Sequence, residues 1–277
     1  MSFAPRMGDT MVIKSILESK LREAIDKDEF ILHYQPKVSL VSGELTGAEA
    51  LIRWNDPAHG PGAAGPFHPD PRETGLIFEV GRWALHKAIE DYLRWRSAGL
   101  PAVRIAVNVS PLQLRHHGFI AEIKDAIGVH ADAAAALELE ITETMIMQDL
   151  NYATAKLQEV RSMGIPVAID DFGTGFSSLR YLAKLPVDSL KIDRSFVADM
   201  TSGSRGLALV STIITLGQAL DLKLVAEGVE TEEQSRLLRL ARCDEMQGFL
   251  VGRPVPSELF EAMFLQLLQP HSRGPAQ

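Results

Sequence analysis

Six short apolar runs in this chain end on a carboxylate or an amide, and this pattern constrains the fold more than any other feature. The runs end at Glu49, Asn108, Glu140, Asp170 with Asp171, Asp193 and Glu227. Short apolar runs that are bounded by turns and alternate with helical patterns are typical of buried parallel strands. Parallel strands of one barrel end on the same face, so these side chains are expected to converge there. Several carboxylates in one cavity raise one another's pKa, so the sequence predicts a divalent metal site.

Eight strand-like segments follow from this pattern, and helical patterns fill the gaps between them. The predicted strands cover residues 30–36, 47–53, 103–108, 137–142, 166–170, 188–192, 223–227 and 245–250. Eight alternating strands and helices predict a TIM-like (β/α)8 barrel, whose functional residues lie where the strands end. A doubly wound open sheet is the main alternative. That fold usually has a glycine-rich phosphate turn after its first strand, and no such turn appears here.

Helix signals agree with this alternation. An apolar stripe from Ile77 to Leu93 predicts a helix that Gly99 and Pro101 stop. Further helices are predicted to begin at Ser110-Pro111, at the capping-box spacing of Thr231 to Gln234, and at Ser257, and one is predicted to end at Gly164. We expect an N-terminal helix or linker remnant over residues 1–20, a barrel domain over 21–266 and a flexible tail over 267–277.

Composition narrows the function. The chain has 277 residues, of which 46% are hydrophobic and 23% charged, a profile typical of a globular domain with a large core. The net charge of −8 argues against binding to DNA or RNA polymers, which requires a basic face. The single cysteine, Cys243, excludes an internal disulfide and fits a reducing compartment. No signal peptide or membrane span is evident, so we expect a cytoplasmic domain without membrane contact.

Alternation along the strands assigns the chemically active side chains to faces. Glu49, Leu51 and Arg53 share one face, which places a metal-type carboxylate beside a phosphate-type guanidinium. Glu138 shares a face with Glu140, and Lys191 with Asp193. Oxygen ligands without His or Cys favour Mg²⁺ or Mn²⁺ over zinc.

The end of the predicted strand at 166–170 carries two adjacent carboxylates. Asp170 and Asp171 can both reach metal if the backbone turns there, and Gly173 and Gly175 would allow such a turn. Glu143 lies just beyond another strand end, where it is placed to hold a loop instead of a metal.

At these positions the chain resembles the EAL-domain cyclic-di-GMP phosphodiesterases, a bacterial signalling family. The matching motifs, in order, are Tyr34-Gln35-Pro36, Glu49-Ala50-Leu51 with Arg53-Trp54, Asn108-Val109-Ser110, Glu138 to Glu143, Asp170 to Gly175, Leu190 to Asp193, Ala226 to Glu230 and Gln247-Gly248-Phe249. The resemblance extends over roughly residues 21–264. It implies a TIM-like barrel, often with its first strand reversed, that hydrolyses cyclic di-GMP to linear 5′-pGpG.

The resemblance also implies roles for individual residues. The metal ligands would be Glu49, Asn108, Glu140, Asp170, Asp171 and Glu227. Lys191 would position the attacking water or stabilise developing charge, with Asp193 as its supporting partner, and Glu227 is the candidate general base. The residues expected to contact substrate are Gln35, Leu51, Arg53, Asp193, Gln247 and Phe249. Glu143 would anchor the loop from Asp171 to Leu179, whose order the family links to metal binding and dimerisation.

The same resemblance implies the cofactors and partners. We expect two Mg²⁺ or Mn²⁺ ions per site, inhibition by Ca²⁺, a homodimer, and attachment to regulatory domains in a longer protein. One segment departs from the family pattern: Phe67 to Gly75 contains Pro71 and Arg72 where the family has residues that begin a helix. This departure puts ligand contacts from that segment in doubt and leaves the predicted metal ligands intact.

Two other functions are compatible with parts of the sequence. The first is a receptor that binds cyclic di-GMP without cleaving it. Such proteins usually lack the glutamate of the EAL motif or acids of the Asp-Asp loop, and this chain keeps Glu49, Asp170 and Asp171 at these positions. A barrel glycosidase with paired carboxylates is the second. It explains the acids and leaves Asn108 and Lys191 unexplained.

Overall fold

The computed structural model describes residues 23–25, 27, 29–55, 65–66, 77–101, 103–173 and 179–268. The predicted N-terminal helix, most of the tail and the unusual segment from Phe67 to Gly75 lie outside the described residues. The proposed domain boundaries therefore remain predictions.

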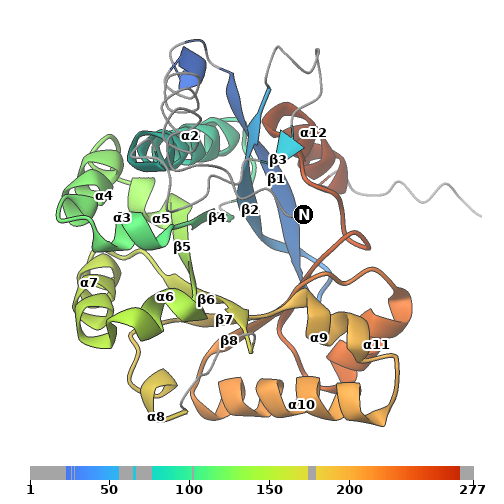
Figure 1. The fold of residues 1–277 in the computed structure, drawn as a ribbon. Coiled ribbons are helices and arrows are strands. Elements are labelled where there is room, and N and C mark those ends of the chain that lie inside the picture. The colour runs from blue at the N-terminus through green and yellow to red at the C-terminus, as the bar shows by residue number, and fades with distance from the viewer. Residues whose placement is uncertain are drawn as a thin grey trace, which may run out of the picture.

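Eight strands form a closed barrel with one reversed strand (Figure 1). They are β1 (Phe30–Ser39), β2 (Leu45–Trp54), β4 (Arg104–Asn108), β5 (Leu137–Thr142), β6 (Val167–Phe172), β7 (Ser189–Ile192), β8 (Lys223–Ala226) and β9 (Glu245–Gln247). From β2 to β9, neighbouring strands in the barrel pair in parallel. β1 closes the barrel because it pairs antiparallel with both β2 and β9. The predicted TIM-like barrel with an antiparallel first strand is confirmed.

Two short strands were not predicted from the sequence. β3 (Gly65–Pro66) pairs with the end of β2, and β10 (Val255–Pro256) pairs with β1. The predicted strand at 245–250 was too long, since β9 ends at Gln247. The reason is close backbone packing at Gly248: a Cβ there would lie 2.2 Å from the carbonyl oxygen of Val229.

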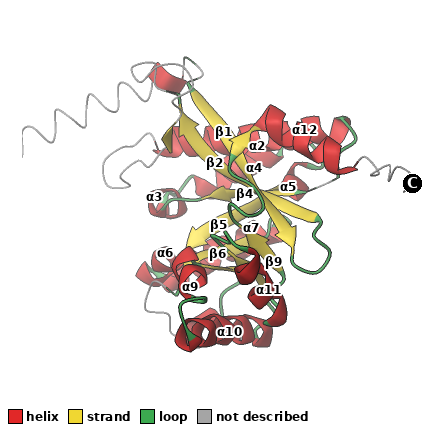
Figure 2. Ribbon diagram, turned by 90° about the vertical axis from the view of Figure 1, so that its right-hand side faces the viewer, coloured by secondary structure: helices red, strands yellow, loops and turns green. Residues whose placement is uncertain are grey.

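Helices surround the barrel, with α10 and α12 on opposite sides of the strands (Figures 1 and 2). The described helices are α2 (Ile77–Ser97), α3 (Pro111–Arg115), α4 (Phe119–Ile127), α5 (Ala133–Ala136), α6 (Glu143–Gln148), α7 (Leu150–Ser162), α8 (Leu179–Leu182), α9 (Arg194–Asp199), α10 (Ser204–Ala219), α11 (Glu232–Leu240) and α12 (Ser257–Leu268). Ser110 and Thr231 cap α3 and α11 with complete capping boxes, as the sequence predicts. None of the described helices is both long and apolar enough to cross a membrane.

The parallel strands are apolar along most of their length because the barrel interior and the surrounding helices bury both faces. The residues of β7 are all buried, and those of β6 are buried except Asp171. Beside β1, Tyr34 packs edge-on against Trp95 of α2, with 4.9 Å between ring centroids, and donates a 2.7 Å hydrogen bond to Asp91 Oδ2. This packing fixes the reversed strand against α2, and it holds the neighbouring residue Gln35 in the barrel wall.

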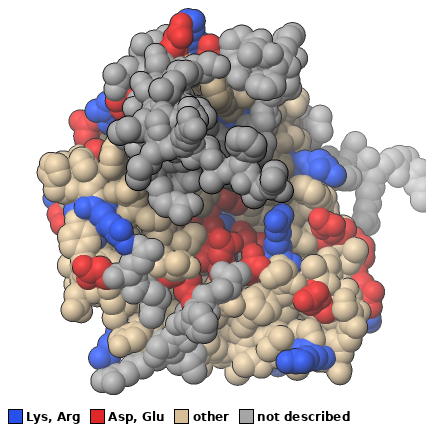
Figure 3. All heavy atoms as spheres, in the orientation of Figure 1, with Lys and Arg blue, Asp and Glu red and all other residues tan. Residues whose placement is uncertain are grey.

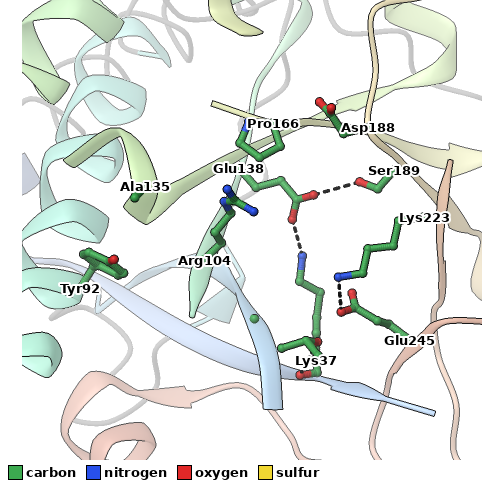
Figure 4. Close-up of a pocket in the computed structure, with 12 residues that line it drawn as sticks. Lys37, Tyr92, Arg104, Ala135, Glu138, Pro166, Asp188, Ser189, Lys223 and Glu245 are labelled. Carbon is green, nitrogen blue, oxygen red and sulfur yellow. Dashed lines mark hydrogen bonds and ion pairs between the residues drawn. The ribbon is translucent and has the colours of Figure 1, made fainter. Parts of the chain in front are cut away.

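Ion pairs line the barrel mouth where the parallel strands begin (Figure 4). Lys37 Nζ lies 2.7 Å from Glu138 Oε2, and Glu138 Oε1 accepts a hydrogen bond from Ser189 Oγ at 2.9 Å. Lys223 Nζ lies 2.6 Å from Glu245 Oε1. These groups line a cavity of about 350 Å³. Lys37 Nζ is also 3.7 Å from Glu140 Oε1, so the charges at this mouth connect with those at the strand ends.

Cys243 is expected to resist alkylation while the protein is folded. The residue is 2% exposed, and burial raises the pKa of its thiol to about 12. The thiolate is the reactive form, so iodoacetamide at neutral pH should label the native protein far more slowly than the same protein in denaturant. Mass spectrometry of timed samples measures both rates. Equal rates would contradict the buried position.

Candidate active site

The residues predicted from the strand ends do converge at one end of the barrel. Glu49, Glu140, Asp170 and Lys191 are all buried there. The register explains the convergence, because Asn108 pairs with Glu140 and Gln35 pairs with Glu49 on neighbouring strands. In the orientation of Figure 1, acidic side chains gather in a hollow near the middle of the visible face (Figure 3).

Lys191 is the charge around which the carboxylates are arranged. Its Nζ lies 2.6 Å from Glu140 Oε2, 2.7 Å from Glu227 Oε1, 3.1 Å from Asp170 Oδ1 and 3.7 Å from Glu49 Oε2. Burial opposes the charge of Lys191, but the surrounding carboxylates outweigh it and raise its pKa well above the ordinary value. The ammonium group is therefore charged at neutral pH and offsets part of the repulsion among the acids.

Two amides hold Glu49. Asn108 Nδ2 donates to Glu49 Oε1 at 2.7 Å, and Gln247 Nε2 donates to Glu49 Oε2 at 2.6 Å. Gln247 Nε2 also lies 3.1 Å from Gln35 Oε1, which links a third amide to the group. Burial favours the protonated form of Glu49, but Lys191 and the two donated hydrogen bonds outweigh it and lower its pKa. Glu49 is thus an ionised carboxylate with a fixed orientation.

The adjacent carboxylates of Asp170 and Asp171 face the same site because the backbone turns between them. The pairing of β6 with β7 shifts register between Ile169 and Phe172, and Asp171 has φ +53°. A left-handed residue in a strand is strained. In a regular strand the side chains of Asp170 and Asp171 would point to opposite faces, and the left-handed conformation of Asp171 turns both toward the same site. Oxygens of Asp170, Asp171 and Glu227 lie within 4.8 Å of one another. Burial and the charge of Asp170 raise the pKa of Asp171.

Two of the glutamates carry strongly shifted pKa values. Burial raises the pKa of Glu227 to about 7, with Asp170 and Glu49 adding to the shift and Lys191 opposing it. Burial likewise raises the pKa of Glu140 well above its ordinary value. The Oε1 atom of Glu140 is buried and accepts no hydrogen bond from the part of the chain that the structure describes. The cluster thus holds more carboxylates than Lys191 alone neutralises.

These residues fit a divalent metal ion. Asp170, Asp171 and Glu227 form a three-oxygen group that could hold an ion. Glu140 Oε1, which accepts no hydrogen bond from the described residues, is a further buried oxygen. The donors are oxygens, the set that Mg²⁺ and Mn²⁺ prefer. A cation added here would also relieve the repulsion that adds to the effect of burial in raising the pKa values of Glu140, Asp171 and Glu227.

Glu143 lies beside this group and contacts the backbone that follows β6. Its Oε2 accepts a hydrogen bond from the backbone N–H of Gly173 at 3.0 Å, and its side chain is buried. Glu143 thus contacts the first residues of the loop that it is expected to anchor, and the anchoring role stays a prediction. Residues 174–178 of that loop lie outside the described residues.

Gly173→Ala is expected to lower activity because Gly173 has φ +97° and a Cβ would lie 2.6 Å from the ring of Phe196. The backbone at residue 173 or the Phe196 ring would have to move, which would weaken the hydrogen bond from residue 173 to Glu143. We therefore expect at least about a tenfold loss in kcat/KM and a loss of stability of about 1–3 kcal/mol. Gly99→Ala is the matched control, with φ +85° and no atom within 4 Å of the added Cβ. It should lose stability and keep its activity. Equal activity in the two variants would contradict a role for Gly173 at the site.

A ligand pocket of about 270 Å³ opens beside the carboxylates. Its described lining residues are Gln35, Glu49, Leu51, Arg194, Glu227, Gly228, Glu230, Gln247, Gly248 and Phe249. Four of the predicted substrate contacts, Gln35, Leu51, Gln247 and Phe249, therefore lie together. The exposed Phe249 ring has the Arg253 guanidinium 4.0 Å from its centroid.

Two predicted contacts are placed differently. Arg53 lies outside the described lining of the pocket, and its Nη1 donates to the carbonyl of Ile52 at 3.0 Å. Asp193 caps α9, where its Oδ1 accepts from the backbone N–H of Ser195 at 3.0 Å. The described partners of Lys191 are Glu49, Glu140, Asp170 and Glu227, so the structure gives Asp193 no direct contact as a supporting partner of Lys191.

A closed barrel with one reversed strand and an acidic centre at its strand ends defines a narrow class of TIM-like proteins. The family model of the EAL domain matches residues 18–254, and this chain belongs to that family.

Known relatives agree with this assignment. The chain is 44% identical over 238 residues to the bifunctional diguanylate cyclase/cyclic di-GMP phosphodiesterase MucR of Pseudomonas aeruginosa. The matched region covers 86% of this chain and 35% of MucR. It is 39% identical over 245 residues to the cyclic di-GMP phosphodiesterase NbdA of the same organism, covering 88% of this chain and 31% of NbdA. This chain thus spans about a third of the length of these relatives. A solved structure of the PaMucR phosphodiesterase in complex with c-di-GMP matches with a TM-score of 0.82 and 42% identity, over 87% of this chain and 98% of that chain.

Proposed function

We propose that this chain is a metal-dependent phosphodiesterase that hydrolyses cyclic di-GMP to linear 5′-pGpG. The observation that carries the proposal is the set of carboxylates around Lys191 at the end of an EAL-family barrel. The names of MucR and NbdA, and the c-di-GMP bound to PaMucR, support the choice of substrate.

Six residues would hold Mg²⁺ or Mn²⁺, and the number of sites proposed is two. Glu49, Asn108, Glu140 and Asp170 would serve one ion, and Asp170 with Asp171 the second, with Glu227 beside it. When bound, the ions supply Lewis acidity that activates water and neutralises charge on the phosphodiester. Asn108 donates its amide N–H to Glu49, which leaves its side-chain oxygen available as a ligand.

The chain's own groups then perform the remaining steps. Glu227, with its pKa of about 7 in the metal-free protein, accepts the proton of the attacking water. Lys191 donates hydrogen bonds to the phosphate oxygens as charge develops on them, a role that its charged state permits. Water adds to phosphorus, the bond from phosphorus to the 3′ oxygen breaks, and the ring opens to leave a 5′-phosphate and a 3′ hydroxyl, whose proton replaces the one that Glu227 accepted. Gln35, Leu51, Gln247 and Phe249 hold the nucleotide in the adjoining pocket, and Arg53 would approach its phosphate by side-chain rotation.

Chromatography of the reaction mixture tests this function. We expect cyclic di-GMP to be converted to pGpG in Mg²⁺ or Mn²⁺ and to remain intact in EDTA or Ca²⁺. Binding of cyclic di-GMP without turnover in any of these ions would contradict the proposal and favour a receptor. Turnover of an aryl glycoside instead would favour a glycosidase. Size-exclusion chromatography with light scattering tests the accompanying expectation of a homodimer.

A further inference from the structure

We propose that Arg194 binds the second phosphodiester of cyclic di-GMP, the one that is not cleaved, and so selects a cyclic dinucleotide over a simpler diester. The inference rests on the proposed function, and it concerns a residue that the motifs did not single out. Three observations carry it: the position of Arg194, the charge of the pocket that it lines, and the freedom of its guanidinium.

The backbone places Arg194 directly beside the catalytic carboxylates. It is the first residue of α9, which begins two residues after β7 and is capped by Asp193. Gly228, the neighbour of Glu227, has φ +65°, and a Cβ there would lie 2.5 Å from Arg194 Cβ. Because only glycine permits this approach, the base of the Arg194 side chain lies against the strand end that carries Glu227.

The other charged residues in the described lining of the pocket are all acidic. Its described lining includes three carboxylates, Glu49, Glu227 and Glu230, and one cation, Arg194. A cyclic dinucleotide carries two phosphodiester anions on opposite sides of its ring. When one lies at the carboxylate cluster with its metal ions, the other enters a pocket whose remaining acids repel it. A guanidinium is suited to this second anion because it donates two parallel hydrogen bonds to phosphate oxygens.

The guanidinium is available for that contact. Arg194 is exposed, and across the described residues the structure records no hydrogen bond or ion pair of its side chain. Arg53, the cation expected from the sequence, donates to a backbone carbonyl and lies outside the described lining. Arg194 is therefore the better-placed cation for an anion in this pocket.

Two substrates separate this binding role from a structural one. Cyclic di-GMP has two phosphodiesters, whereas bis(p-nitrophenyl) phosphate has one and needs no second anion site. For Arg194→Ala we expect KM for cyclic di-GMP to rise about tenfold or more, the loss typical of one charged hydrogen-bonded contact. We expect kcat for cyclic di-GMP and turnover of the aryl diester to stay within about twofold of the unmodified chain. Arg194→Lys should recover part of the affinity.

Arg236→Ala is the control, since Arg236 is an exposed residue of α11 away from the described pocket lining. It should leave both substrates unaffected. An unchanged KM for cyclic di-GMP in Arg194→Ala, or a parallel loss with both substrates, would overturn the inference. Calorimetric binding of cyclic di-GMP keeps the two proposals distinct: if the unmodified chain binds without turnover, the proposed function fails, and a tenfold weaker affinity in Arg194→Ala still supports the role of Arg194.

Discussion

Glu49→Ala is expected to lower kcat/KM for cyclic di-GMP by more than about 100-fold, because Glu49 would be a direct metal ligand and even residues that only orient such ligands cost about 10- to 100-fold when removed. The substitution removes the carboxylate that Asn108 and Gln247 hold in place. The fold should persist, because the substitution removes the repulsion of Glu49 on Glu140 and Glu227. Steady-state kinetics in Mg²⁺ and thermal unfolding in EDTA measure the two effects.

Two further variants sharpen this result. Glu49→Gln keeps the shape of the side chain and removes its charge, so it should be nearly as inactive as Glu49→Ala. Glu44→Ala alters an exposed glutamate just before β2 and should retain full activity. If Glu49→Ala keeps more than about a tenth of the activity while remaining folded, Glu49 is not a metal ligand.

Lys191→Met is expected to destabilise the metal-free protein by about 3–5 kcal/mol, the cost of leaving buried partner charges uncompensated. Lys191 Nζ lies within 4.0 Å of four carboxylates, so its loss leaves the electrostatic repulsion among these carboxylates uncompensated. The deficit should increase with pH above about 4.5. The reason is that burial raises the pKa values of Glu140 and Glu227 in the folded state, where Lys191 opposes the shift, so without Lys191 the folded state binds still more protons than the unfolded state. Urea denaturation in EDTA at pH 5 and pH 8 measures it.

Metal ions should partly replace the missing ammonium group. We expect Mn²⁺ to raise the free energy of unfolding of Lys191→Met more than that of the unmodified chain, without restoring hydrolysis. Lys124→Met is the matched control, because Lys124 Nζ lies 2.8 Å from Glu159 on the surface with both side chains about half exposed. That pair should be worth less than about 1 kcal/mol. Equal stability of the Lys191 and Lys124 variants in EDTA would contradict the central position of Lys191.

Much of this architecture was predictable because buried parallel strands produce short apolar runs with a polar residue at the end. The runs that end at Glu49, Glu140 and Asp170 predicted both the strands and the face on which the acids meet. The cap residues Ser110 and Thr231 marked helix starts because their side-chain oxygens satisfy backbone N–H groups that the helix leaves unpaired.

Other features depend on contacts between segments that are distant in the sequence, and the periodicity of hydrophobic residues does not predict such contacts. Strands β3 and β10 are two residues each and exist only because β2 and β1 offer edges at those positions. The early end of β9 follows from packing between Gly248 and Val229. The turn at Asp171 was expected from the glycines after it, but the left-handed residue is Asp171 itself, in addition to Gly173.

Two cations near the carboxylates were not predicted from the motifs: Lys37, and Arg194, for which we propose a ligand-binding role. The sequence placed Glu138 on the face of Glu140, yet only the pairing of β1 with β9 shows that Lys37 lies between them. Arg194 directly follows Asp193 in the sequence, and the structure shows that the Asp193 carboxylate caps α9. The partner of the Asp193 carboxylate is thus a backbone N–H, which residue spacing alone does not distinguish from an ion pair with Arg194.

A single-turnover reaction in H₂¹⁸O is the most direct test of hydrolysis at this site. With the protein in excess over cyclic di-GMP and Mg²⁺ or Mn²⁺ present, we predict that mass spectrometry finds pGpG with one ¹⁸O atom in its 5′-phosphate. The same mixture in EDTA, or with Glu49→Ala, should return unlabelled cyclic di-GMP. Recovery of intact cyclic di-GMP from the metal-loaded, ligand-bound protein would contradict a phosphodiesterase and identify the chain as a receptor.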